Sequence, residues 1–98
     1  MTQDEMKLAI FERESNYLFA KARASCLKAM NKFPQPNYVA AKLAEEAGEV
    51  VRAYIHRAEG RGTTADLEGE AVQLIGLVLR LVFEGDETIT ANAAKVTP

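Results

Sequence analysis

The breaks in this chain leave three long uninterrupted segments, and that division limits the folds it can adopt. Prolines occur only at Pro34, Pro36 and Pro98. Pro34 and Pro36 together make one break, and Pro98 is the last residue of the sequence. Glycines mark two further breaks, within 59–63 and within 84–86. None of the three segments alternates apolar and polar residues at the two-residue period of a half-buried strand. The sequence therefore predicts an all-α fold with three main helices and a short C-terminal tail.

Sequence signals also predict where these helices begin and end. We expect the first helix over about residues 4–31. Its apolar side chains form one stripe expected to be buried, at spacings of three, four or seven residues: Leu8, Phe11, Leu18, Ala22, Ala29 and Phe33. Asn37 is expected to cap the second helix, which should continue to about Ala58. Thr63 and Asp66 have capping-box spacing at the third helix, and Gly85 follows its end. The tail from about residue 86 fits either a short helix or a flexible segment.

Size, charge and cysteine content exclude several classes of protein. A chain of 98 residues is expected to form one domain, 1–98. Its 14 acidic and 12 basic side chains give a net charge of -2, whereas a protein that coats nucleic acid needs a basic excess. The single cysteine, Cys26, is expected in the core and favours a reducing compartment. No signal peptide is visible, and the apolar stretch 74–83 is shorter than the roughly 18 residues of a membrane span. We expect a soluble cytoplasmic protein with no nucleic-acid or membrane partner.

The third predicted helix indicates self-association. Between residues 72 and 83 its apolar side chains point in almost every direction around the helix. Such a helix needs cover on most sides, which two other helices of a short chain cannot supply. A core of this size is also marginally stable, because only roughly 65% of the chain's surface is buried on folding. We therefore expect the helical bundle to be completed by homo-oligomerisation, as a homodimer or homotetramer.

Acidic side chains gather on the second and third predicted helices. Glu45, Glu46 and Glu49 fall within about 100° of one another on the second helix. Glu70 and Gln73 lie about 60° apart on the narrow polar strip of the third. If the two helices pack antiparallel, Glu46 and Glu49 face Glu70 and Gln73. Oxygen ligands that converge from two rigid helices suit Mg²⁺, with Mn²⁺ as an alternative.

A simpler interpretation of these acids is a solvated helix face. Lys42 and Arg52 lie at ion-pairing distance along the helix from Glu46 and Glu49, and acidic residues on helices usually point to water. Glu70 favours the metal interpretation, because it lies beside apolar residues in a helix that should be buried. Its position one turn into that helix leaves it a path to water, so both interpretations stay open.

The segment 42–50, with the sequence KLAEEAGEV, is followed by Glu70-Ala71-Val72-Gln73 and an aliphatic run. This pattern, over about residues 33–84, resembles the MazG-like all-α nucleoside triphosphate pyrophosphohydrolases. The signature of that family is Glu-Glu-x-x-Glu on one helix and Glu-x-x-Asp on the next. The resemblance implies Mg²⁺-dependent cleavage of a (deoxy)nucleoside triphosphate to the monophosphate and pyrophosphate. It also implies dimers, or dimers of dimers, built on helical bundles.

The resemblance assigns a role to each acidic position. Glu46, Glu49 and Glu70 would be metal ligands, and Glu45 would be a further ligand or the base that orients water. Gln73 stands where the family has Asp, so an oxygen ligand remains but one negative charge is lost. The alternative function is therefore a catalytically weakened nucleotide-binding or regulatory helical oligomer on the same fold. A third hypothesis is a purely structural oligomer whose acids are only solvated.

Polar and basic residues before the second helix are candidates for substrate binding. Lys28 and Lys32 belong to a basic stripe of the first helix that would complement the charge of a triphosphate. A solvated basic face explains the same residues. Asn37, with Phe33 and Tyr38, is placed to contact a base, although a helix cap and a hydrophobic staple account for these three residues as well.

Overall fold

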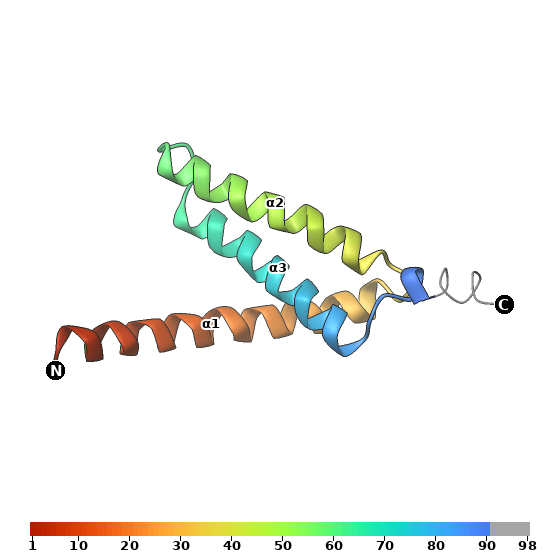
Figure 1. Ribbon diagram of the computed structural model, residues 1–98, viewed down its shortest axis with the longest axis horizontal. Helices are drawn as coiled ribbons and strands as arrows, with labels where there is room; N and C mark the ends of the chain where they lie inside the picture. Colours follow the sequence, from red (N-terminus) through yellow and green to blue (C-terminus); the bar gives the residue numbers. More distant parts are fainter. Residues whose placement is uncertain (91–98) are drawn as a thin grey trace.

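The computed structural model describes residues 1–90, which form three long helices and a short helical turn over 87–90 (Figure 1). The long helices are α1 (Gln3–Lys32), α2 (Val39–Ala58) and α3 (Thr64–Phe83). α2 and α3 form an antiparallel hairpin, and α3 also packs along the C-terminal part of α1 (Figure 1). The all-α prediction is confirmed. Of the tail from about residue 86, the part over 91–98 lies outside the described residues.

Within the described part of the chain, no helix combines the length and the apolar character that crossing a membrane requires.

Local sequence signals set both ends of α3. The amide of Asp66 donates to the Thr63 hydroxyl at 3.1 Å, and the amide of Thr63 donates to the Asp66 carboxylate at 2.9 Å. This is the predicted capping box. Gly85 follows the helix with φ +84°, and its amide donates to the carbonyl groups of Arg80 and Leu81. Glycine adopts this left-handed conformation without strain, so the predicted stop signal is also confirmed.

The start of α2 differs from the prediction, because Asn37 is not its cap. Tyr38 precedes the helix in the left-handed conformation, with φ 53° and no side-chain capping bond. The free amide of Ala40 donates instead to a carboxylate oxygen of Asp86, 46 residues further along the chain, at 2.9 Å. Asp86 is buried, and the hydrogen bond from Ala40 is the main cause that lowers its pKa. A carboxylate from beyond α3 therefore replaces the local cap of α2.

Arg80 on α3 is a buried charged side chain, with only 1% of its surface exposed. Its Nη2 donates to the carbonyl of Phe33, and its Nη1 donates to the carbonyl of Ala29 at 3.5 Å and to Asn37 Oδ1 at 3.3 Å. Its Nε donates to Glu84 at 3.0 Å. The Phe33 carbonyl lies at the C-cap of α1, where the intrahelical donors end. The Ala29 carbonyl already accepts from the amide of Phe33 at 2.8 Å, so Arg80 adds a second donor there. One guanidinium thus joins the end of α1, the loop before α2 and the end of α3.

The contact between α1 and α3 is closest at Gly76. A Cβ atom on this residue would lie 3.3 Å from the carbonyl oxygen of Ala22. Ala22 and Cys26 are buried here, and Val39 at the start of α2 is the third buried apolar residue of the described part. The prediction for Cys26 is confirmed. Three small or medium-sized residues make a small core, so hydrogen bonds contribute much of what holds α1 to the hairpin.

The N-terminal part of α1 diverges from the hairpin (Figure 1), although Arg13, Glu14 and Tyr17 still line a small cavity with Glu68 of α3. Residues 1–14 are exposed throughout, and Leu8 and Phe11 expose 55% and 66% of their surface. The predicted burial of Leu8, Phe11 and Phe33 is therefore wrong within one chain, whereas Ala22 in the same stripe is buried. The radius of gyration is 16.9 Å, compared with about 13 Å for a compact domain of this length. Three helices of one chain leave the bundle open.

Replacing Arg80 with methionine should lower the free energy of unfolding by about 3 kcal/mol or more, because the Phe33 carbonyl, Asn37 Oδ1 and the Glu84 carboxylate then lose a buried donor. Arg80→Lys should recover only part of this loss, since one ammonium group cannot reach the acceptors that the planar guanidinium reaches. Urea denaturation followed by helical circular dichroism measures both. Arg13→Met, on the exposed half of α1, is the control, and equal stability of the two methionine variants would contradict this role of Arg80.

Candidate functional site

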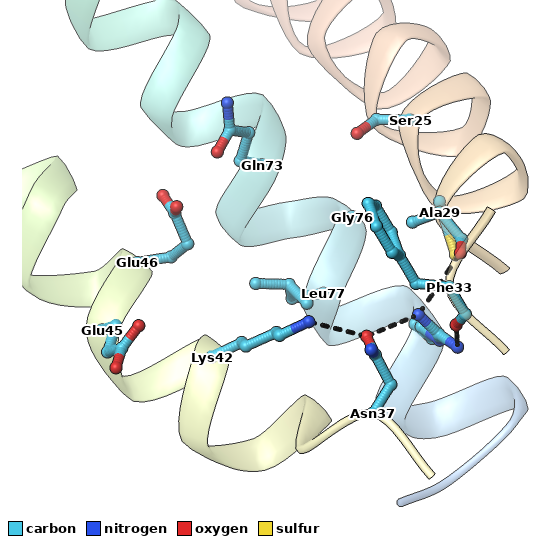
Figure 2. A pocket seen from close by; sticks show the side chains of 12 residues that line it. Ser25, Ala29, Phe33, Asn37, Lys42, Glu45, Glu46, Gln73, Gly76 and Leu77 are labelled. Carbon is cyan, nitrogen blue, oxygen red and sulfur yellow. Dashed lines mark hydrogen bonds between the residues drawn. The ribbon is translucent and has the colours of Figure 1, made fainter. Parts of the chain in front are cut away.

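The antiparallel hairpin brings the predicted acidic residues of α2 and α3 together. Glu46 on α2 and Gln73 on α3 extend into the same space between the two helices (Figure 2). Glu70, one turn before Gln73, lies close enough to Glu46 to change its ionisation. The predicted meeting of acidic residues across the hairpin is therefore present for this pair.

A first cavity of about 410 Å³ opens between the three helices (Figure 2). Its carboxylate end is formed by Glu45, Glu46 and Gln73. Its other polar end, near the loop before α2, is formed by Asn37, Lys42 and Arg80. Apolar side chains, among them Phe33 and Leu77, form walls between these ends. The cavity thus carries acidic groups at one end and hydrogen-bond donors with positive charge at the other.

A second cavity, of about 510 Å³, lies along the other half of the hairpin. Three of the predicted site residues line it: Glu49, Glu70 and Gln73. Three basic or imidazole side chains line it as well: Arg52, His56 and Arg61. Gln73 lines both cavities, so the predicted cluster is divided between two cavities that share this residue.

The carboxyl group of Glu46 is the most perturbed acid of the site. Burial is the largest cause, and hydrogen bonding and repulsion from Glu70 and repulsion from Glu49 and Glu45 add to it, so that its pKa is raised to about 7. Although Glu70 is its neighbour, Glu46 Oε2 is buried and has no hydrogen-bond partner of standard geometry within residues 1–90. A buried carboxylate oxygen without a partner is costly in the absence of a compensating charge.

The carboxylate oxygens of the candidate site are ligands of the type that a divalent cation prefers, but they do not converge on one point. Glu46, Glu49 and Glu70 offer hard carboxylate oxygens, and the unpartnered Oε2 of Glu46 is free to accept a cation. Among the side chains of residues 1–90, however, no three of the acidic, histidine or cysteine type converge as a ready cage. Rotation of exposed side chains, such as that of Glu49, would be needed to close one around an ion.

The predicted substrate-binding residues separate in the structure. Asn37 lines the first cavity, and its Oδ1 accepts hydrogen bonds from Lys42 Nζ at 2.8 Å and from Arg80 Nη1 at 3.3 Å (Figure 2). Lys28 and Lys32 lie on α1 and are not among the residues that line either cavity. Their role in binding stays a prediction.

Lys42 and Arg80 are site residues that the sequence analysis did not assign. Lys42 precedes Glu46 by one helical turn, so this spacing was the available signal, and ion pairing on the surface was its simpler interpretation. The only feature of the sequence that could have singled out Arg80 is its charge within the apolar stretch 74–83. Its partners are separated from it by 43 residues or more, apart from Glu84 in the next turn.

Comparison of the chain with protein-family models, with curated proteins and with solved structures found no match. The residues of the two cavities and their contacts are therefore the basis on which a function is assigned.

Metal-free protein should become less stable as the pH rises toward 8, because of Glu46. Its pKa is raised from 4.5 to about 7, so the folded protein holds this proton more tightly than the unfolded chain does. The resulting stabilisation is fully present below pH 4.5 and is lost as the pH rises through about 7.

Glu46→Gln, which is neutral at every pH, should therefore melt at a higher temperature than the wild type at pH 8. The difference should shrink toward pH 5. Thermal circular dichroism in the presence of EDTA measures it, with Glu12→Gln on the exposed part of α1 as the control. Equal melting temperatures of Glu46→Gln and wild type at pH 8 would show that Glu46 is already ionised without cost.

Proposed function

We propose that this protein is a Mg²⁺-dependent nucleoside triphosphate pyrophosphohydrolase, which converts a (d)NTP to the (d)NMP and pyrophosphate. The observation that carries the proposal is the buried, unpartnered oxygen of Glu46 beside Glu70 of the facing helix. Both residues belong to the pattern that resembles the MazG-like enzymes. A bound cation would offset the repulsion among the neighbouring carboxylates.

Under this proposal Glu46, Glu49 and Glu70 would hold the Mg²⁺, or Mn²⁺ in its place, and Gln73 would add a neutral amide oxygen. A bound divalent ion supplies positive charge that polarises a phosphate oxygen and makes water more acidic. Gln73 is suited to this position because it lines both cavities, between Glu46 on one side and Glu49 and Glu70 on the other. Its neutrality predicts weaker metal binding than an aspartate would give.

Glu45 and the basic residues of the second cavity take the other roles. Glu45 lines the first cavity beside Glu46, where its carboxylate would orient the attacking water and accept its proton. Arg52, His56 and Arg61 line the cavity of Glu49 and Glu70. The two arginines would offset the charge of the phosphate chain, and a ring N–H of His56 would donate a hydrogen bond to it. They are better placed for this than Lys28 and Lys32, which line neither cavity.

We propose a small nucleotide as the substrate, and the cytoplasm as the site of action. The net charge of -2 disfavours nucleic acid as a partner, because binding a polyphosphate backbone depends on a basic surface. Two cavities of about 410 and 510 Å³ fall in the size range of small-molecule sites.

Pyrophosphate release from each (d)NTP with Mg²⁺ or Mn²⁺ tests the activity. We expect turnover by the wild type and a loss of at least about 100-fold in Glu49→Ala, because a metal ligand is removed. Glu12→Ala should retain full activity. Gln73→Asp should raise activity at limiting metal, because it restores a fourth negative ligand.

The outcomes separate the two candidate functions. Activity in Gln73→Asp alone would support the alternative, a catalytically weakened nucleotide-binding or regulatory oligomer. No pyrophosphate from any substrate with either protein would contradict the enzymatic proposal.

We also propose that two or four copies of the chain complete the bundle. Apolar side chains are exposed at two places that the hairpin leaves uncovered, the N-terminal half of α1 and the end of α3. Val82 and Phe83 expose 83% and 81% of their surface, and Leu8 and Phe11 more than half of theirs. Exposed apolar residues in this number are typical of a surface that is buried by a partner.

Size-exclusion chromatography with light scattering should therefore give the mass of a dimer or tetramer. The double variant Leu8→Lys/Phe11→Lys should shift the protein toward the monomer, because charge replaces apolar contact area. Glu12→Gln/Glu14→Gln changes the net charge of the same helix by the same amount and should leave the assembly intact. A monomeric wild type, or equal masses for both double variants, would contradict the proposed interface.

A further inference from the structure

The end of the first cavity near the loop carries hydrogen-bond donors whose orientation can be deduced. Asn37 Oδ1 receives hydrogen bonds from Lys42 Nζ and Arg80 Nη1. An ammonium and a guanidinium group have donors only and no acceptor. The amide group of Asn37 therefore cannot be turned the other way, because its NH₂ group would then face two cationic donors.

This orientation leaves the NH₂ group of Asn37 for a ligand. Within residues 1–90 no hydrogen bond is formed by Asn37 Nδ2, although the residue is only partly exposed and lines the cavity. Lys42 Nζ uses one donor on Asn37 and has two more. Arg80 is 1% exposed, and its hydrogen bonds are directed to the protein. The groups that Asn37 and Lys42 offer to this end of the cavity are thus donors.

The position of Asn37 relative to the carboxylates indicates which part of a nucleotide it would meet. Glu46 lies seven residues into α2, a rise of roughly 10 Å from the start of the helix that Asn37 precedes. Figure 2 shows the two side chains at opposite ends of the cavity. If the phosphates lie at the carboxylate end, the base extends toward Asn37. The exocyclic group farthest from the ribose then arrives at Asn37.

We infer that the first cavity binds the base of the nucleotide, and that Asn37 donates to the exocyclic carbonyl oxygen farthest from the ribose. The protein accordingly prefers keto bases (uracil, thymine, hypoxanthine or guanine) to bases with an amino group in that place. This inference rests on the proposed function for the ligand being a nucleotide. An amino group in that place would face the NH₂ group of Asn37, and neither of these two donors would then have an acceptor.

The neighbouring walls suit a flat ring but offer little free aromatic surface. Leu77 and Ala29 contribute apolar surface on α3 and α1. Lys32 Nζ and Lys42 Nζ each lie 5.4 Å from the centre of the Phe33 ring, so cations already occupy positions near that ring. Selectivity in this cavity therefore comes from the hydrogen bond to Asn37 rather than from stacking on Phe33.

Two pairs of nucleotides isolate the carbonyl group as the variable. Inosine and adenosine monophosphates differ at the group on position 6, and uridine and cytidine monophosphates differ at position 4. Calorimetric titration of the metal-free protein should show the keto member of each pair binding about tenfold more tightly or better. The ratio of kcat/KM for ITP over ATP and for UTP over CTP should follow the same order.

Asn37→Asp is the decisive variant. Its carboxylate can still accept from Lys42 and Arg80, so the melting temperature should not fall, but the two N–H donors of the Asn37 amide are gone. The keto preference should therefore disappear or reverse, since the carboxylate now accepts from an amino group. Asn31→Asp makes the same chemical change on an exposed part of α1, outside the cavity lining, and should keep the preference.

The results separate this inference from the proposed function. Keto-selective binding without pyrophosphate release would contradict the enzymatic proposal and support the proposed binding of the base in the first cavity. Pyrophosphate release with equal kcat/KM for ITP and ATP and for UTP and CTP would overturn the inference. A keto preference that survives in Asn37→Asp would overturn it too. In both cases the enzymatic proposal would stand. Failure of all four monophosphates to bind, with no base preference in turnover, would overturn the inference as well.

Discussion

The buried guanidinium of Arg80 is the interaction on which the arrangement of this chain depends. α1 and α2 do not pack on each other within the described residues, so α3 and the loop at its end must hold them in place. Arg80 does this by donating to the last carbonyl groups of α1 and to Asn37 before α2. A lysine could not span these acceptors, and an apolar residue would remove the guanidinium group that they share. The core around it is small, which makes this set of polar contacts more important than in a larger domain.

The same arginine polarises the first cavity. Together with Lys42 it holds the oxygen of Asn37 and makes the loop end of the cavity positive and rich in donors. The other end holds Glu45 and Glu46, and burial, together with the nearby Glu70, raises the pKa of Glu46 to about 7. An elongated ligand with an acceptor at one end would meet the donors of the loop, and anionic groups at its other end would reach the carboxylates only together with a cation. A nucleotide has this distribution of groups.

A single chain also leaves many apolar side chains exposed. Its longest dimension is 61 Å, and the N-terminal part of α1 contributes to it by diverging from the hairpin (Figure 1). Apolar residues there cannot contribute to stability until something covers them. A closed bundle of several copies would place those residues in a core and would also support the hairpin that carries the acidic residues.

Local patterns in the sequence were enough to predict three helices, both ends of α3 and part of the candidate site. The three-residue spacing of Thr63 and Asp66 and the position of Gly85 predicted both ends of α3, because such caps depend only on adjacent residues. Helical periodicity and a short connection were also enough to bring Glu46 next to Glu70. These predictions succeeded because the relevant distances are set within one helix or one hairpin.

What only the tertiary structure decided involves residues far apart in the chain. Asp86 caps α2 from 46 residues away, and Asn37, predicted to be that cap, instead accepts hydrogen bonds from two cations. The stripe of α1 remains uncovered at Leu8 and Phe11, although its periodicity is that of a buried face. A repeating pattern states which side chains need a partner, but it does not state which segment, or which copy of the chain, supplies one. That choice depends on how long-range hydrogen bonds and buried charge fix the packing of the helices, and no local spacing encodes it.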